Sequence, residues 1–158
     1  MIWGLSIETF TLVHVVLSLI GIASGLVVLL GLLARKRLDG WTVLFLATTA
    51  ATSITGFGFP FDHLSPAHRV GFVSLVALVV AVFARYGRHL TGSWRRIYVV
   101  SAAIALYLNV FVGVVQAFMK IPALAALAPH QTEPPFLIVQ LVVLLLFVGL
   151  TIAAARRF

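Results

Sequence analysis

"FTLVHVVLSLIGIASGLVVLLG", residues 10–31, is a run of 22 residues without a charged side chain. At a rise of 1.5 Å per residue such a helix is about 33 Å long, which is enough to cross a hydrocarbon core of about 30 Å. The run therefore predicts a membrane-spanning helix. No basic cluster precedes it, so we expect a permanent span rather than a cleaved signal peptide.

The rest of the chain has the same apolar character. Of its 158 residues 62% are hydrophobic and 9% are charged, and the mean hydropathy is +1.16. Soluble domains carry roughly 25% charged residues, so the composition predicts a single integral membrane domain over residues 1–158. The chain has no cysteine, which excludes disulfides and thiolate metal sites.

Charged residues lie at the boundaries of the apolar runs and divide them into five lengths near that of a membrane span. The sequence thus predicts an all-α membrane protein, a five-transmembrane-helix bundle. In the third helix we expect Ser65 as N-cap and Pro66 at the first helical position. The predicted helices cover about 7–34, 41–58, 66–86, 97–119 and 135–155.

Basic residues predict the orientation of this bundle. Nine fall on one side and two, Arg69 and Lys120, on the other. By the positive-inside rule the N-terminus is outside (periplasmic) and the C-terminus cytoplasmic, in a bacterial inner membrane. The basic residues behind the net charge of +7 are thus explained by membrane topology. We expect the lipid bilayer as the partner of this chain and no nucleic acid. The nine are Arg35, Lys36, Arg37, Arg85, Arg88, Arg95, Arg96, Arg156 and Arg157.

Polar chemistry gathers on the predicted outer side. The stretch "GFGFPFDHLSPAHRVGF", residues 56–72, joins the second and third spans there. This side also receives all six prolines and three of the four acidic residues. We therefore expect the functional end to be the outer one. Four of the five histidines lie on it: His14, His63, His68 and His130.

His14 is the one histidine deep within a predicted span. Ser18, Gly21 and Gly25 follow at +4, +7 and +11 and share its helix face. An imidazole above a strip of glycines suits a flat porphyrin, because the ring can approach the backbone. The same pattern also fits helix packing through Gly-x-x-x-Gly, with His14 hydrogen-bonded across helices. Both interpretations stay open, although an ionisable residue inside a membrane is a functional candidate.

His68 is the best candidate for a second ligand, because it lies in the first turn of the third helix at similar depth. His63 and His130 are loop residues that can reach the same region. Imidazoles ligate haem iron, zinc and copper. The spacing of these histidines matches no metal motif, so hydrogen-bonded residues at the membrane surface remain the alternative.

Two amides in the outer half, Gln116 and Gln140, are candidates to bond a quinone carbonyl or a haem propionate. The alternative is an interhelical amide bond, which is typically worth about 0.6 kcal/mol. The hydroxyls of the second helix can bond back to their own helix and carry a weak signal. In the last outer loop, residues 122–128 are expected to form a short surface helix.

The stretches "VHVVLSLIGIASGLVVLLGLLARKRLDGWTVLFLATTAATSITG" (13–56) and "SPAHRVGF" (65–72) resemble uncharacterised small bacterial multi-helix membrane proteins. They are more loosely similar to small b-type haem membrane proteins, including the cytochrome b561 group and the membrane-bound protoporphyrinogen oxidase family. That similarity implies His14 and His68 as axial ligands. The second, fourth and fifth predicted spans hold no histidine, so a single outer-side haem is the most that it implies.

The leading hypothesis is a protein that binds one haem b, or a similar redox ligand, near the periplasmic face and exchanges electrons with quinone. His14 and His68 would ligate, Gly21 and Gly25 would make room, and Gln116 or Gln140 would orient the ligand. One alternative is a non-catalytic accessory subunit of a larger membrane complex, and a homo-oligomer is compatible with it. Another is a copper or zinc site on the periplasmic face, formed by His63, His68, His130 and Glu133, with His14 as a further candidate metal ligand.

Overall fold

A computed structural model describes residues 1–59 and 66–158. These residues contain helices and no strand, only an isolated bridge between Ile2 and Leu5, which confirms the all-α class. The long helices, with α3 continued by η1, begin and end within three residues of the expected ranges. Ser65, the expected N-cap, lies outside the described residues. In order, the elements are α1 (Ile7–Leu33), α2 (Asp39–Gly56), α3 (Pro66–Val82), the π-helical turn η1 (Phe83–Gly87), α4 (Trp94–Lys120), the short α5 (Pro122–Leu127) and α6 (Pro134–Arg157).

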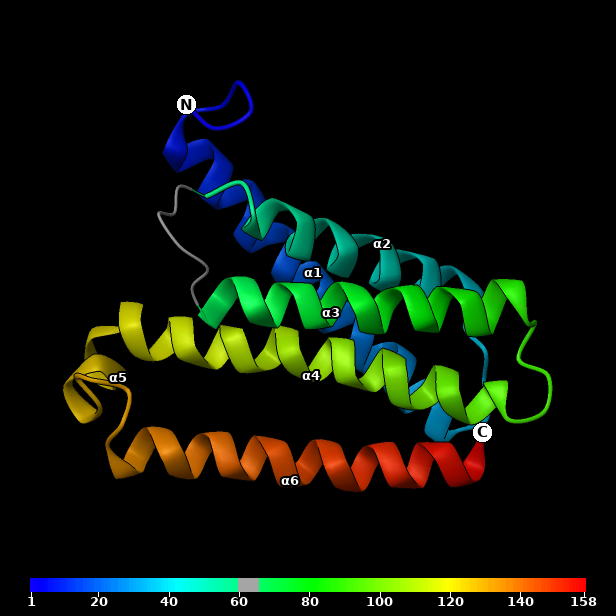
Figure 1. Cartoon of the computed structure of the whole chain (residues 1–158). Helices are drawn as coiled ribbons and strands as arrows, with labels where there is room; N and C mark the ends of the chain where they lie inside the picture. Colours follow the sequence, from blue (N-terminus) through cyan, green and yellow to red (C-terminus); the bar gives the residue numbers. More distant parts are fainter. Residues whose placement is uncertain (60–65) are drawn as a thin grey trace.

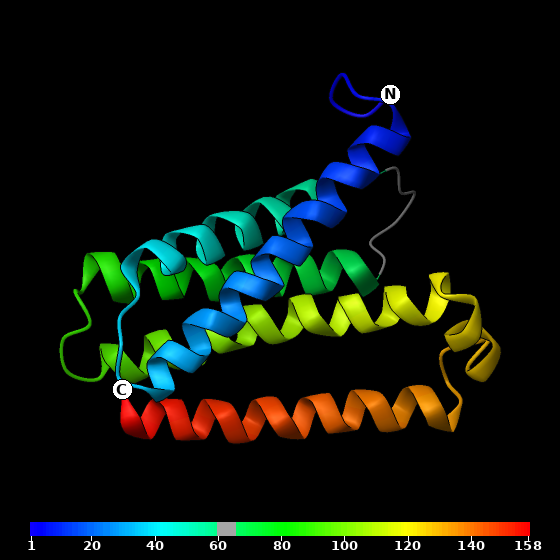
Figure 2. The same ribbon diagram turned by 180° about the vertical axis from the view of Figure 1, so that it is seen from behind.

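The long helices form a bundle that α1 crosses obliquely (Figures 1 and 2). Helix α1 packs most extensively against α2, α3 packs between α2 and α4, and α6 packs mainly on α4. Both views place the N-terminus and α5 at one end of the bundle and the C-terminus at the other. We call these the α5 end and the C-terminal end.

Four helical segments are long and apolar enough to cross a membrane: α1, α3 continued by η1, α4 and α6. The chain is therefore a multi-pass membrane protein. Helix α2 falls short, because its 18 residues include five threonines, a serine and Asp39. Three of those hydroxyls turn back onto their own helix: Thr48, for example, donates to the carbonyl of Leu44 at 2.6 Å.

The main apolar core lies toward the C-terminal end. It joins the second half of α1 to the first halves of α2 and α4, with Leu32, Phe45, Tyr98 and Leu106 each at most 2% exposed. The polar side chains of the half nearer the α5 end lie outside this close-packed apolar core.

Arg85 is an unexpected member of the C-terminal end, because its side chain is only 2% exposed. Its Nη2 contacts the carboxylate of Asp39, at the start of α2, and the carbonyl of Arg37 at 3.3 Å. The guanidinium also lies 5.3 Å from the ring centre of Tyr98, within the range of a cation–π contact. The side chain thereby ties η1 to the loop between α1 and α2.

Candidate functional site

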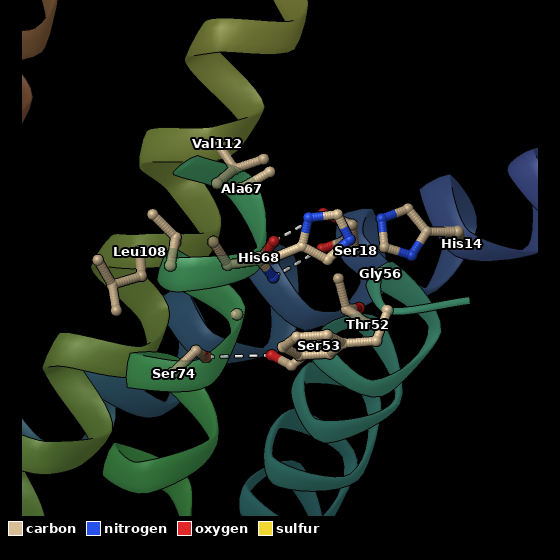
Figure 3. Close-up of a pocket in the computed structure, with 14 residues that line it drawn as sticks. His14, Ser18, Thr52, Ser53, Gly56, Ala67, His68, Ser74, Leu108 and Val112 are labelled. Carbon is tan, nitrogen blue, oxygen red and sulfur yellow. Dashed lines mark hydrogen bonds between the residues drawn. The ribbon is translucent and has the colours of Figure 1, made fainter. Parts of the chain in front are cut away.

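A cavity of about 110 Å³ opens between α1, α2, α3 and α4 in the half of the bundle nearer the α5 end. Each of these helices contributes side chains to its wall (Figure 3). The apolar part of the wall includes Phe57, Leu108 and Val112. The polar side chains that line it are His14, Ser18, Thr52, Ser53, His68, Ser74 and Asn109.

The imidazole of His14 is fixed by a hydrogen bond from α1 to α2. Its Nδ1 lies 2.7 Å from Oγ1 of Thr55. That hydroxyl donates its own proton to the carbonyl of Ala51 at 2.7 Å, with Thr52 O as a second acceptor at 3.1 Å. The hydroxyl has one proton, and its 2.7 Å contact with the carbonyl of Ala51 uses it, so we assign Nδ1–H of His14 as the donor to Thr55. In the neutral ring Nε2 then carries the lone pair.

An edge-to-face aromatic series holds the other side of this imidazole. The ring of Phe59 lies 5.2 Å from that of His14, Phe10 lies 5.0 Å from Phe59, and Trp3 lies 5.3 Å from Phe10. All three pairs are near perpendicular, the favourable arrangement for aromatic rings. Together with Thr55, this series from the N-terminal turn to His14 sets the orientation of the imidazole.

His68 reaches the same cavity from the first turn of α3. Its side chain is 8% exposed and packs on the ring of Phe57 at 5.5 Å. Figure 3 shows the imidazoles of His14 and His68 entering the cavity from α1 and α3. The structure therefore brings these two candidate residues together.

Two side-chain pairs complete the polar wall between helices. Ser18 donates to Oδ1 of Asn109 at 2.7 Å, and Nδ2 of Asn109 returns a bond to the carbonyl of Ser18 at 3.3 Å. Ser53 of α2 bonds Ser74 of α3 at 3.1 Å. Such bonds join helices where lipid and protein offer few other polar partners.

Gly21 and Gly25 do not line this cavity. A methyl group at Gly21 would lie 2.9 Å from Oγ1 of Thr49, and one at Gly25 would lie 2.6 Å from Cδ1 of Leu106. The space above both glycines is therefore filled by α2 and α4. This corrects the expectation that they leave room for a porphyrin; they allow close helix packing instead.

The other expected site residues lie elsewhere. Gln140 of α6 donates to the carbonyl of Phe111 at 3.2 Å, an interhelical amide bond, and neither it nor Gln116 belongs to the cavity wall. His130 is exposed in the loop before α6, where its N–H donates to the carboxylate of Glu133. His63 lies outside the described residues.

Glu133 organises that loop by accepting hydrogen bonds from the N–H groups of His130 and Thr132, at 3.1 and 3.0 Å. Desolvation acts to raise the pKa of Glu133. The backbone hydrogen bonds and the nearby His130 outweigh it and hold the pKa below its ordinary value.

The arrangement limits which groups the cavity can hold. No cluster of three or more His, Cys, Asp or Glu side chains occurs in residues 1–59 and 66–158. Pockets that hold drug-sized ligands measure about 300–1,000 Å³, a haem with its four pyrrole rings is no smaller than such a ligand, and this cavity measures about 110 Å³. With the glycine strip also filled, the described residues do not fit a porphyrin.

Sequence reasoning gave little weight to the hydroxyls of α2, of which Thr55 positions His14 and Thr52 and Ser53 line the cavity. Their concentration in the outer half of α2 was the available signal.

No protein-family model, curated protein or solved structure matches the chain. The resemblance to small b-type haem proteins therefore stays a prediction.

Proposed function

We propose that the chain is a five-span protein of the bacterial inner membrane with a periplasmic N-terminus. Helix α2 lies against both α1 and α3, and its Thr48, Thr52 and Thr55 hydroxyls donate to carbonyls of the same helix, which lowers the cost of crossing lipid. The α1–α2 loop, η1 with the turn that follows it, the start of α4 and the end of α6 carry nine basic residues at the C-terminal end. The two at the α5 end are Arg69 and Lys120, so the positive-inside rule supports this orientation.

We further propose that the periplasmic-side cavity binds the head group of a membrane quinone or quinol. The observation that carries this is a cavity of about 110 Å³ with polar side chains from four helices, one of them the oriented imidazole of His14. An engineered cavity of about 150 Å³ holds benzene, so this smaller, open cavity can enclose part of a single ring, and the ring substituents would lie in its open side. An isoprenoid tail would leave through the open side into lipid.

The lining favours binding over chemistry. The described residues of the cavity wall include two imidazoles, hydroxyls and an amide, and no Asp, Glu, Lys or Arg. We therefore expect the chain to act as a quinone-binding accessory subunit of a larger membrane complex, whose other chains would supply any electron-transfer cofactor. A porphyrin does not fit this cavity, and the proposed function requires no haem in this chain.

The test is saturable binding of a short-chain ubiquinone, in its oxidised and reduced forms, to the protein in lipid nanodiscs. Ala67 lines the cavity mouth and is exposed, so Ala67→Trp should block entry without disturbing the fold. Val79, on the same helix and 68% exposed, provides the matched control Val79→Trp. Absence of binding of both forms, or equal binding by Ala67→Trp, would overturn the proposal.

An absorption spectrum and metal analysis of protein extracted in mild detergent complete the test. We expect no Soret band and no stoichiometric metal. A Soret band that His14→Ala removes would replace the quinone proposal with haem ligation.

A further inference from the structure

Several protons of the cavity wall are used in hydrogen bonds within the protein. Nδ1–H of His14 donates to Thr55, which leaves Nε2 as an acceptor. Ser18 donates to Asn109 at 2.7 Å, and Thr52 donates to the carbonyl of Thr48 at 2.8 Å. At His14 the wall therefore offers a ligand a lone pair.

We propose that the cavity selects a hydroxyl-bearing ring, the quinol, over the corresponding quinone. This inference rests on the proposed function and names the redox form of its ligand. A quinol hydroxyl donates to Nε2 of His14, whereas a quinone carbonyl has only lone pairs and would face another lone pair. Leaving the partly buried acceptor of His14 without a donor is unfavourable, so we expect quinol to bind roughly tenfold more tightly, which corresponds to about 1.4 kcal/mol.

Thr55 is the positioning residue for this selectivity, because its hydroxyl accepts from Nδ1 and so determines which nitrogen of His14 carries the proton. Without that acceptor, the tautomer protonated at Nε2 becomes available and can donate to a quinone carbonyl. The preference for quinol should then shrink, although Thr55 itself touches no ligand.

The experiment measures the dissociation constants of a short-chain ubiquinol and its ubiquinone for the full chain in nanodiscs, under anaerobic conditions. Thr55→Val removes the hydroxyl, and Thr55→Ser restores it. Thr11→Val is the matched control, because Thr11 also bonds its own helix, at Ile7 O, and does not line the cavity. We expect a ratio near ten for wild type, Thr55→Ser and Thr11→Val, and a ratio below about three for Thr55→Val.

A second readout is independent of binding. Nitrogen-15 shifts of the His14 ring should report a proton on Nδ1 in the wild type and a mixture of tautomers in Thr55→Val. Equal affinities for the two forms, a tighter quinone, or a proton on Nε2 in the wild type would overturn this inference alone. Failure of both forms to bind would instead overturn the proposed function, and the selectivity with it.

Discussion

Replacing Asp39 by alanine should destabilise the protein more than replacing its partner Arg85 by methionine. The reason is the unequal burial of the pair, since the side chain of Arg85 is 1% exposed and that of Asp39 is 76% exposed. Asp39→Ala leaves a buried guanidinium with the carbonyl of Arg37 and the ring of Tyr98. Arg85→Met leaves only a carboxylate that is already in contact with solvent.

The structure sets the size of this difference. Removing one partner of a fully buried pair costs about 3–5 kcal/mol. Solvent at Asp39 screens part of the interaction, so we expect about 2–3 kcal/mol for Asp39→Ala. Replacing a buried charge by an apolar side chain of similar volume is often close to neutral, so Arg85→Met should cost about 1 kcal/mol or less. In the double variant no buried charge remains, and its stability should match that of Arg85→Met.

Reversible unfolding in mixed detergent micelles, followed by circular dichroism, measures these three free energies of unfolding. Glu8→Ala is the control for the loss of a surface charge, because Glu8 is an exposed carboxylate at the N-terminal end of α1. If Asp39→Ala is no more destabilising than Arg85→Met, or if the two effects add in the double variant, the assignment of a buried charge held by Asp39 is refuted.

Two further predictions concern packing and pH. Gly25→Ala should lower the unfolding free energy by about 1–3 kcal/mol through overpacking. Gly149→Ala is the control and should not lower it, because no atom lies within 4 Å of the added methyl group. Equal stabilities of the two variants would contradict the close packing at Gly25. The lowered pKa of Glu133 means that its hydrogen bonds stabilise the loop above the ordinary value of 4.5 and are lost as pH falls through the lowered value. The amide resonances of His130 and Thr132 should therefore titrate with a midpoint below pH 4.5. A midpoint at or above pH 4.5, or the same titration in Glu133→Gln, would contradict the hydrogen bonds from these amides to the Glu133 carboxylate.

The helical class and the positions of the long helices could be predicted from the sequence, because solvation alone determines them. A stretch such as residues 10–31 cannot leave its backbone polar groups unpaired in lipid, so it must be helical. The charged residues that interrupt the apolar runs mark the helix ends without any knowledge of tertiary contacts. His14 and His68 were identified for a related reason, since polar residues at these depths are rare.

The remaining parts depend on contacts between residues distant in the chain. Arg85 counted only as a topology determinant, because nothing local reveals that Asp39, 46 residues earlier, reaches it. Thr55 was discounted because a helical threonine bonds its own backbone whether or not it also accepts from His14, 41 residues away. Gly21 allows close approach, but the sequence does not state whether a cofactor or Thr49 occupies the space.

The link between Arg85 and Asp39 also bears on how the protein enters the membrane during synthesis. Helix α2 is the least apolar long helix, and its first residue, Asp39, pairs with a side chain that emerges from the ribosome 46 residues later. We expect α2 to wait at the membrane surface, or within the insertion machinery, until α3 arrives. The two would then enter together as a hairpin, with the ion pair closing at its base, at the C-terminal end of the bundle.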